Sequence, residues 1–255
     1  WGFEDIHLDL ARSICRQAAA RADLDAARIT GTPPGIWLTS EETCALLHAY
    51  AIPAAVSVMA HSADEAEALA AVIGFPVVAK VAAARIAHKT DMGGVRLDLS
   101  SPREVRKAFT DVMARARQVV PETAIEGVLV QPMVTGGIET LIGIAHDPVF
   151  GPLVGFGMGG IDVELIGDVR FRIAPLTDHD AEEMMQEVRG FRLLQGYRGR
   201  PAGDVEALRE TLFRVSRLAE DLPELLELDL NPVMVLPPGK GVRIVDARAR
   251  VAVRP

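Results

Sequence analysis

The sequence predicts a mixed α/β fold of the α+β type in which much of the sheet is antiparallel. Short apolar runs follow one another at hairpin spacing, and segments with helix-capping signals lie between them. No internal repeat or low-complexity segment interrupts this order. With 255 residues, the chain is long enough for one large domain or for two smaller domains that share a cleft.

The helices are predicted from apolar periodicity and from caps. Apolar residues recur every four positions near the start of the chain, and S/T-x-x-E patterns begin at Thr39 and Ser62. Ser101 precedes a proline in the first turn of another helix. We expect helices over residues 4–22, 39–50, 62–73, 101–119, 178–188 and 203–220.

The strands are predicted from apolar runs and from period-two alternation. The clearest alternation is at 95–99, where Val95, Leu97 and Leu99 alternate with charged residues. We expect strands over residues 54–59, 76–82, 95–99, 127–133, 138–145, 152–157 and 169–174, and a final hairpin at 226–235 and 242–251.

Composition and charge exclude several classes of function. The formal net charge is −8, which argues against general binding of DNA, RNA or anionic membranes, although a local positive patch could still bind a small anion. Cys15 and Cys44 form no metal-binding pattern. Two free thiols in a reducing cytoplasm are favoured, and a disulfide between them is the alternative. No signal peptide or membrane-spanning apolar run is visible, so a cytoplasmic location is expected. Because the first residue is Trp1, we expect an upstream part to be missing.

A cationic segment follows the predicted strand at 76–82. Lys80 lies inside an apolar run, and residues 83–94 add Lys89, a histidine and the pair Gly93-Gly94. Glycines allow close approach of the backbone, and their N–H groups can bind phosphate oxygens. The segment is therefore a candidate lid over a polyphosphate. The alternatives are a lysine on a solvated strand face and a plain hairpin turn.

The final hairpin carries a candidate metal site. In a strand, Glu227, Asp229 and Asn231 share one face, while the intervening leucines take the other. If the hairpin centres on its Pro-Gly turn, Asn231 stands directly opposite Asp246. Oxygen ligands in such a pair suit Mg²⁺, which fills its remaining positions with water and phosphate. The alternative is a polar outer face in which Arg248 is the counter-ion.

Two further segments contain glycine or polar residues next to strands. Gln131 and Met133 follow an apolar strand and could line an adenine pocket, with Glu139 shortly after them. Residues 157–160 form a glycine-rich stretch that matches neither a P-loop nor a dinucleotide fingerprint, so a turn between strands is expected.

Taken together, the motifs resemble the ATP-grasp subunit of ADP-forming acyl-CoA synthetases. The resemblance covers roughly residues 37–251 and rests on PVVAK at 76–80, HKTDMGGV at 88–95, GIAHDPVFGP at 143–152, RIAPL at 172–176 and ELDLNP at 227–232. It implies an ATP-grasp fold, with two α+β subdomains that clasp a nucleotide. The subdomains are expected over 37–125 and 126–255, after a connector over 1–36 from an upstream domain.

The resemblance also implies roles for individual residues. Lys80 matches the lysine that contacts nucleotide phosphates, and Glu139 matches an acid near the adenine and ribose. Asn231 and Asp246 match the Mg²⁺ ligands, in agreement with the hairpin argument. His88 matches a loop histidine that relays the phosphoryl group in some members; its alternative is a residue that only holds the loop.

The implied function is that of the Mg-ATP/ADP-binding domain of an acid–thiol ligase, which exchanges the γ-phosphoryl group with a histidine during acyl-CoA formation or cleavage. The CoA-binding and ligase domains, upstream or in a separate subunit, would be its partners, so the chain alone would be incomplete as an enzyme. One alternative is a nucleotide-binding regulatory domain, without turnover, of a synthetase-like protein lysine acetyltransferase that carries a C-terminal acetyltransferase domain. A third hypothesis is another ATP-grasp ligase.

Overall fold

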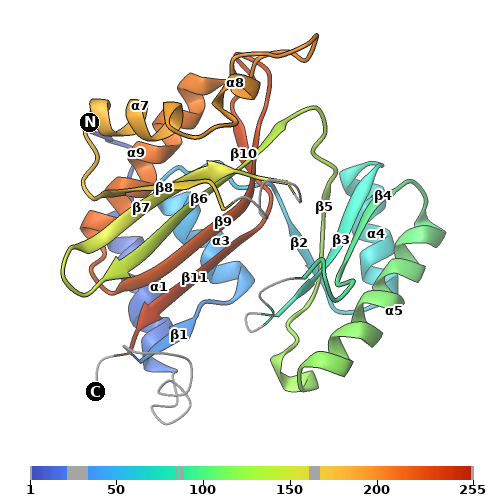
Figure 1. Ribbon diagram of the computed structural model, residues 1–255. Coiled ribbons are helices and arrows are strands. Elements are labelled where there is room, and N and C mark those ends of the chain that lie inside the picture. Colours follow the sequence, from blue (N-terminus) through green and yellow to red (C-terminus); the bar gives the residue numbers. More distant parts are fainter. Residues whose placement is uncertain (1, 22–33, 84–85, 87–88, 161–166, 254–255) are drawn as a thin grey trace. The chain divides into compact units, whose positions relative to one another are not determined.

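The computed structural model describes residues 2–21, 34–83, 86, 89–160 and 167–253 (Figure 1). The chain divides into two compact units. Unit 1 consists of Trp1–Ala54 and Gly136–Pro255, and unit 2 consists of Ala55–Thr135. Each unit combines helices with an antiparallel sheet, which confirms the predicted α+β class.

Unit 1 is built on a seven-stranded sheet whose strand pairings are antiparallel. The order along the sheet is β1 (Gly35–Trp37), β11 (Ala247–Ala252), β9 (Leu225–Val235), β6 (Ile138–Asp147), β7 (Gly151–Met158) and β8 (Val169–Ile173). A further strand, β10 (Val242–Ile244), pairs with the end of β9. The final hairpin thus lies in the middle of the sheet rather than at its edge.

One face of this sheet is covered by helices, and the core of unit 1 lies between them (Figure 1). The helices of unit 1 are α1 (Leu8–Ala20), α3 (Ser40–Ala49), α7 (Asp178–Gln186), α8 (Phe191–Leu194) and α9 (Val205–Asp221). Buried Leu212 and Leu218 of α9 join Ile142 of β6 and Leu228 of β9 in a single apolar cluster. Because side chains alternate along a strand, the residues between these positions point to the other side of the sheet.

Unit 2 is a four-stranded sheet with two helices on one face (Figure 1). The strand order is β2 (Val58–Ala60), β5 (Gly127–Pro132), β3 (Val77–Ala82) and β4 (Val95–Leu99). The helices are α4 (Ala63–Ile73) and α5 (Pro102–Val119), and a short 3-10 turn, η1 (Glu122–Ala124), follows α5. Ala79 and Val81 of β3 pack in the core beneath the helices, so Val78 and Lys80 lie on the opposite face.

The boundaries of the units differ from those expected from the sequence. Residues 37–54 group with unit 1, because β1 pairs with β11 and α3 packs on the same sheet. Residues 126–135 group with unit 2, because β5 is the neighbour of both β2 and β3. The strand expected at 54–59 is short and begins only at Val58.

The segment expected to be a connector is packed into unit 1. Ala11 and Ile14 of α1 are buried in its core. Arg214 of α9 donates hydrogen bonds to both carboxylate oxygens of Asp5, each at 3.0 Å, and stacks on the ring of Phe3 with its Cζ 4.3 Å from the centroid. The hydrogen bond from Arg214 lowers the pKa of Asp5 below its ordinary value. The first residues are therefore held to α9 by charge as well as by apolar contacts.

The capping box predicted at Thr39 is present, and it yields a stability prediction. Thr39 Oγ1 accepts from the backbone N–H of Glu42 at 3.2 Å, and the Glu42 carboxylate accepts from the N–H of Thr39 at 2.8 Å. Thr39→Ala is expected to lower the free energy of unfolding by about 1 kcal/mol. For a chain of this size, that corresponds to a fall in melting temperature of about 2–4 °C. Thr39→Ser retains the hydroxyl and should melt close to the wild type in the same thermal scan; equal melting of both variants would contradict the cap's contribution.

Candidate functional site: the nucleotide-binding residues

Lys80 lies in the middle of the unit 2 sheet. It pairs with Val95 on β4 and with Leu129 on β5. Lys80 is only 5% exposed. The alternative that it is an ordinary lysine on a solvated strand face is therefore wrong. A buried ammonium is costly unless anionic groups or hydrogen bonds compensate it. The position of this lysine on the face of the sheet away from the helices suits a contact with an anionic ligand.

The glycine pair forms a tight turn after the cationic segment. The N–H of Gly93 donates to the carbonyl of Thr90 at 2.9 Å, and the N–H of Gly94 donates to the carbonyl of Lys89 at 2.7 Å. Both amides are therefore used inside the turn in this conformation. Gly94 also packs tightly, since an added Cβ would lie 2.9 Å from Cγ1 of Val81. The same added Cβ would lie 3.0 Å from the carbonyl oxygen of Lys89, a residue that is 7% exposed. His88 lies outside the described residues.

Gln131 has an unused donor on the same face of unit 2 as Lys80. Its side chain is fully buried, and its Oε1 accepts from the hydroxyl of Ser57 at 2.9 Å. Within the described part of the chain, its Nε2 has no hydrogen-bond partner. Buried polar groups are almost always paired, so an unpaired amide suits a ligand acceptor. Met133 follows, with its backbone N–H bonded to the carbonyl of Pro76 at 3.1 Å.

The hairpin register in unit 1 is as predicted. The N–H of Asn231 donates to the carbonyl of Asp246 at 3.1 Å, so these two residues stand opposite each other. Leu228 and Leu230 are buried in the core, and Asp229 lies between them on the other side of the sheet. The predicted alternation of leucines and polar residues along β9 is therefore confirmed.

The chemistry of this pair fits Mg²⁺. The amide oxygen of Asn231 and the carboxylate of Asp246 are hard oxygen donors on one side of the sheet, with Asp229 as the next residue on that side. The described residues contain no cluster of three or more His, Cys, Asp or Glu that could hold a metal ion. Mg²⁺ takes few protein ligands and completes its shell with phosphate and water, so two oxygen donors would be enough to hold it. The role of both residues as ligands stays a prediction.

Glu139 lies at the beginning of β6, opposite Met234 of β9, and is exposed. The glycine-rich stretch predicted to be a plain turn lies directly against it. The N–H of Gly159 donates to the carbonyl of Glu139 at 2.8 Å, and a Cβ on Gly160 would lie 3.9 Å from the Glu139 carboxylate. Any larger residue at Gly159 would meet the Glu139 backbone at 3.1 Å. The glycines in the sequence indicated that the backbone is closely approached here, but the sequence did not show that the neighbour is Glu139.

Comparison with known proteins identifies the family. The sequence profile described as the ATP-grasp domain matches residues 34–251. The chain belongs to the ATP-grasp family.

The relatives of this ATP-grasp domain include ADP-forming CoA ligases. The ADP-forming acetate–CoA ligase I of Archaeoglobus fulgidus is 46% identical over 203 residues, which are 80% of this chain and 29% of that protein. The beta subunit of the ADP-forming acetate–CoA ligase II of Pyrococcus furiosus is 42% identical over 204 residues, 80% of this chain and 86% of the subunit. The chain thus spans under a third of the single-chain enzyme but most of the separate beta subunit.

Solved structures confirm the ATP-grasp fold. An acetyl-coenzyme A synthetase 1 of Ca. Korarchaeum cryptofilum, in complex with coenzyme A and Ca-AMPCP, has a TM-score of 0.79 and 42% identity, covering 89% of this chain and 97% of that one. A second structure of that enzyme contains Mg-AMPPCP and a phosphohistidine segment pointing towards the nucleotide-binding site. It has a TM-score of 0.75 and 36% identity, and it covers 94% of this chain and 99% of that one.

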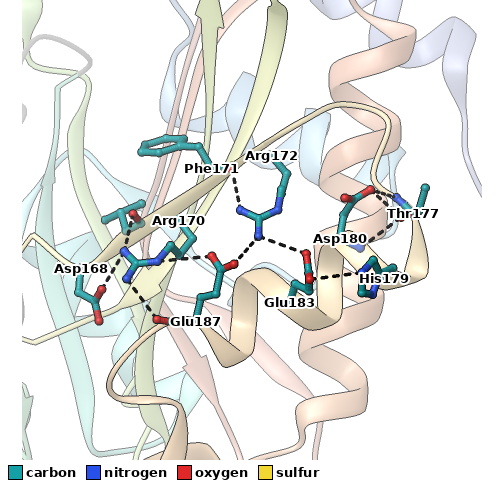
Figure 2. A network of polar contacts seen from close by, with 10 residues as sticks. Asp168, Arg170, Phe171, Arg172, Thr177, His179, Asp180, Glu183 and Glu187 are labelled. Carbon is teal, nitrogen blue, oxygen red and sulfur yellow. Dashed lines mark hydrogen bonds and ion pairs between the residues drawn. The ribbon is translucent and has the colours of Figure 1, made fainter.

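One of the motifs of this ATP-grasp domain has a structural role. Figure 2 shows Arg170 and Arg172 of β8 turned towards α7, where they meet the carboxylate of Glu187. Arg172 reaches Glu187 at 2.8 Å and Glu183 at 3.6 Å, and Arg170 reaches Asp168 at 2.9 Å. The arginine of the RIAPL motif therefore fixes the edge strand to its helix, and its charge is already matched.

Two expectations about the whole ATP-grasp chain can be compared with the structure. Cys15 and Cys44 are both free thiols, as favoured, and burial raises the pKa of Cys15 to about 12. Of the helices in the described ranges, none has the length and apolar character needed to span a membrane.

Proposed function

We propose that this domain binds Mg-ATP and Mg-ADP and exchanges the γ-phosphoryl group with a histidine, as the nucleotide-binding part of an ADP-forming acyl-CoA synthetase. The observation that carries the proposal is the cross-strand pair of Asn231 and Asp246 on the polar side of the β9–β11 hairpin. Its relatives, among them separate beta subunits of ADP-forming acetate–CoA ligases, support the same assignment. The enzyme would be an acid–thiol ligase, and CoA-binding and ligase domains, in the same chain or in another subunit, would be its partners.

The residues of unit 2 would bind the nucleotide itself. Lys80 and Lys89 supply positive charge for the phosphates, and the close turn at Gly93-Gly94 positions Lys89. Gln131 offers its unpaired amide as a donor to the base, and Met133 adds apolar surface beside it. Glu139 of unit 1 would accept hydrogen bonds from the adenosine part.

The hairpin of unit 1 would hold the metal through Asn231 and Asp246. A bound Mg²⁺ neutralises charge on the phosphates and fixes their orientation. The protein's own contribution is to keep two oxygen donors opposite each other in the centre of a rigid sheet. The hydrogen bond between the Asn231 N–H and the Asp246 carbonyl maintains that arrangement.

The proposed transfer step involves a histidine nucleophile. A lone pair on a neutral imidazole nitrogen forms the N–P bond, while the bond from the γ-phosphorus to its bridging oxygen breaks and leaves the electron pair on ADP. The imidazole N–H proton is released, and the charge is balanced. His88 is the candidate relay on this chain, and the principal histidine would come from the partner domains. In the relative crystallised with Mg-AMPPCP, a phosphohistidine segment points towards the nucleotide-binding site, which supports this step.

The test of nucleotide binding is calorimetry of the 255-residue chain with Mg-ADP, paired with thermal unfolding. Ligand at 10 to 100 times its Kd should stabilise the folded state by about 1.4–2.7 kcal/mol. AMP and metal-free ADP are the matched control ligands and should stabilise it less. Neither heat nor a melting shift at millimolar Mg-ADP would contradict the proposal.

We place the domain in the cytoplasm, where its free thiols would stay reduced. The regulatory alternative, a domain without turnover in a protein acetyltransferase, gains no support from the relatives described above, all of which are ligases or synthetases. The acetyltransferase partner is likewise unsupported.

A further inference from the structure

A stacked arginine lies next to the proposed metal site on the polar side of the unit 1 sheet. The guanidinium Cζ of Arg248 on β11 is 4.1 Å from the centroid of the Trp37 ring on β1. Ile36 and Ala249 pack in or against the core, so both Trp37 and Arg248 point to the side away from the helices. The aromatic ring holds the guanidinium through a cation–π contact and limits its rotamers.

Arg248 has a guanidinium nitrogen without a hydrogen-bond partner in the part of the chain that the structure describes, although Asp229 stands opposite it on β9. This nitrogen, Nε, is buried. The neighbouring Arg250 differs, because its Nε is 3.3 Å from the Glu227 carboxylate. Arg170 and Arg172 also meet acids. Arg248 is thus an oriented cation suited to an anionic ligand.

The order of residues along β9 locates this cation relative to the rest of the site. Glu139 is opposite Met234, Asn231 is opposite Asp246, and Arg248 is opposite Asp229. Arg248 therefore lies one same-face step, about 7 Å, beyond the proposed metal ligands and away from Glu139. If Glu139 is at the nucleoside end, Arg248 is on the far side of the metal, where the terminal phosphate of a triphosphate would extend.

We propose that Arg248, oriented by Trp37, binds the terminal phosphoryl group of the Mg-bound triphosphate. This inference rests on the proposed function and adds a specific contact to it. A guanidinium forms two parallel charge-assisted hydrogen bonds with a phosphoryl group, which a lysine cannot match. Because the contact is to the terminal group, it distinguishes a triphosphate from a diphosphate. Trp37 is a positioning residue and does not touch the ligand.

The experiment is calorimetric titration of the 255-residue chain with Mg-AMPPCP and with Mg-ADP. Arg248→Gln is expected to weaken Mg-AMPPCP binding by about 10- to 100-fold, the usual range for a lost charged hydrogen bond, and to leave Mg-ADP binding unchanged. Arg248→Lys should recover part of the loss. Trp37→Leu should lower Mg-AMPPCP affinity less than Arg248→Gln does, again without affecting Mg-ADP. The matched control is Arg243→Gln on β10, nearer the hairpin turn. Among the described residues its guanidinium donates to the carbonyl of its neighbour Val242, and the substitution should change the affinity for neither ligand.

The outcomes separate this inference from the function on which it rests. If the wild-type chain binds neither nucleotide, both the proposed function and the Arg248 contact are contradicted. A wild-type chain that binds both, together with an Arg248→Gln variant that binds Mg-AMPPCP equally well, overturns the contact alone. Equal losses for Mg-AMPPCP and Mg-ADP also overturn it, because the effect would not be specific to the terminal phosphate. If Arg248→Gln has a clearly lower melting temperature than the wild type, the affinities of Arg248→Lys and Trp37→Leu for Mg-AMPPCP and Mg-ADP test the contact instead. A loss confined to Mg-AMPPCP supports it, and equal affinities or equal losses overturn it.

Discussion

Asp246→Asn is expected to weaken Mg-nucleotide binding by about a hundredfold or more, with little change in metal-free nucleotide binding. Residues that only orient a metal ligand already contribute about 10- to 100-fold to metal affinity, and this change removes a charged oxygen from the ion's own shell. The fold should tolerate it. Asp246 bonds its hairpin partner Asn231 through its backbone carbonyl, which the substitution retains.

The measurement is titration with ADP in excess Mg²⁺ and again in a chelator. Glu227→Gln is the matched control: it removes one negative charge from the same side of β9 but lies two same-face positions from Asn231 and pairs with Arg250. Its affinities should resemble those of the wild type in both buffers. If Asp246→Asn lowers nucleotide affinity equally with and without Mg²⁺, the carboxylate stabilises the fold rather than the metal. A lower melting temperature of this variant would point to the same structural role.

Local signals in this sequence predicted the elements well because each signal has its own physical cause. Thr39 and Ser62 cap their helices through backbone N–H groups three residues on, as their patterns required. The turn at Pro238 and Gly239 fixed the hairpin register, and with it the pairing of Asn231 with Asp246. Such features depend only on residues close in the chain.

Features that depend on distant residues were not accessible from the sequence. The first strand, Gly35–Trp37, pairs with the last, Ala247–Ala252, and this long-range pairing moves residues 37–54 into unit 1. The same pairing brings Trp37 under Arg248, which the sequence suggested only as a counter-ion. Strand pairing across a whole chain is set by the packing of the sheet, and no local propensity encodes it.

The turn at Gly93-Gly94 shows a different limit. Two adjacent glycines were compatible both with a phosphate-binding loop and with a hairpin turn. In the structure their N–H groups donate to Thr90 and Lys89, so the turn uses both donors. Composition indicated that the backbone is permissive at this point, whereas the hydrogen-bond partners were determined by the conformation.

His88→Ala is expected to lower acyl-CoA formation in the complete synthetase by roughly three orders of magnitude, while nucleotide affinity stays close to that of the wild type. A relay histidine must offer a neutral imidazole nitrogen to phosphorus and needs cations nearby to spread the charge of the transferring group. Lys89 is the next residue in the chain, and small residues flank the segment on both sides. Loss of the imidazole removes the nucleophile but leaves Lys80, Gln131 and the metal ligands in place.

The test follows overall turnover and Mg-ADP affinity in the same preparations. His61→Ala, an exposed histidine of unit 2 outside the predicted site, is the matched control and should change neither quantity. His88→Gln retains a polar side chain without a nucleophilic nitrogen, so it should be as inactive as His88→Ala if transfer is the role. A parallel fall in affinity and turnover would make His88 part of the nucleotide lid instead. Unchanged turnover in both variants would remove the relay from the mechanism, and the phosphoryl group would then have to pass directly from the nucleotide to the histidine of the partner domains.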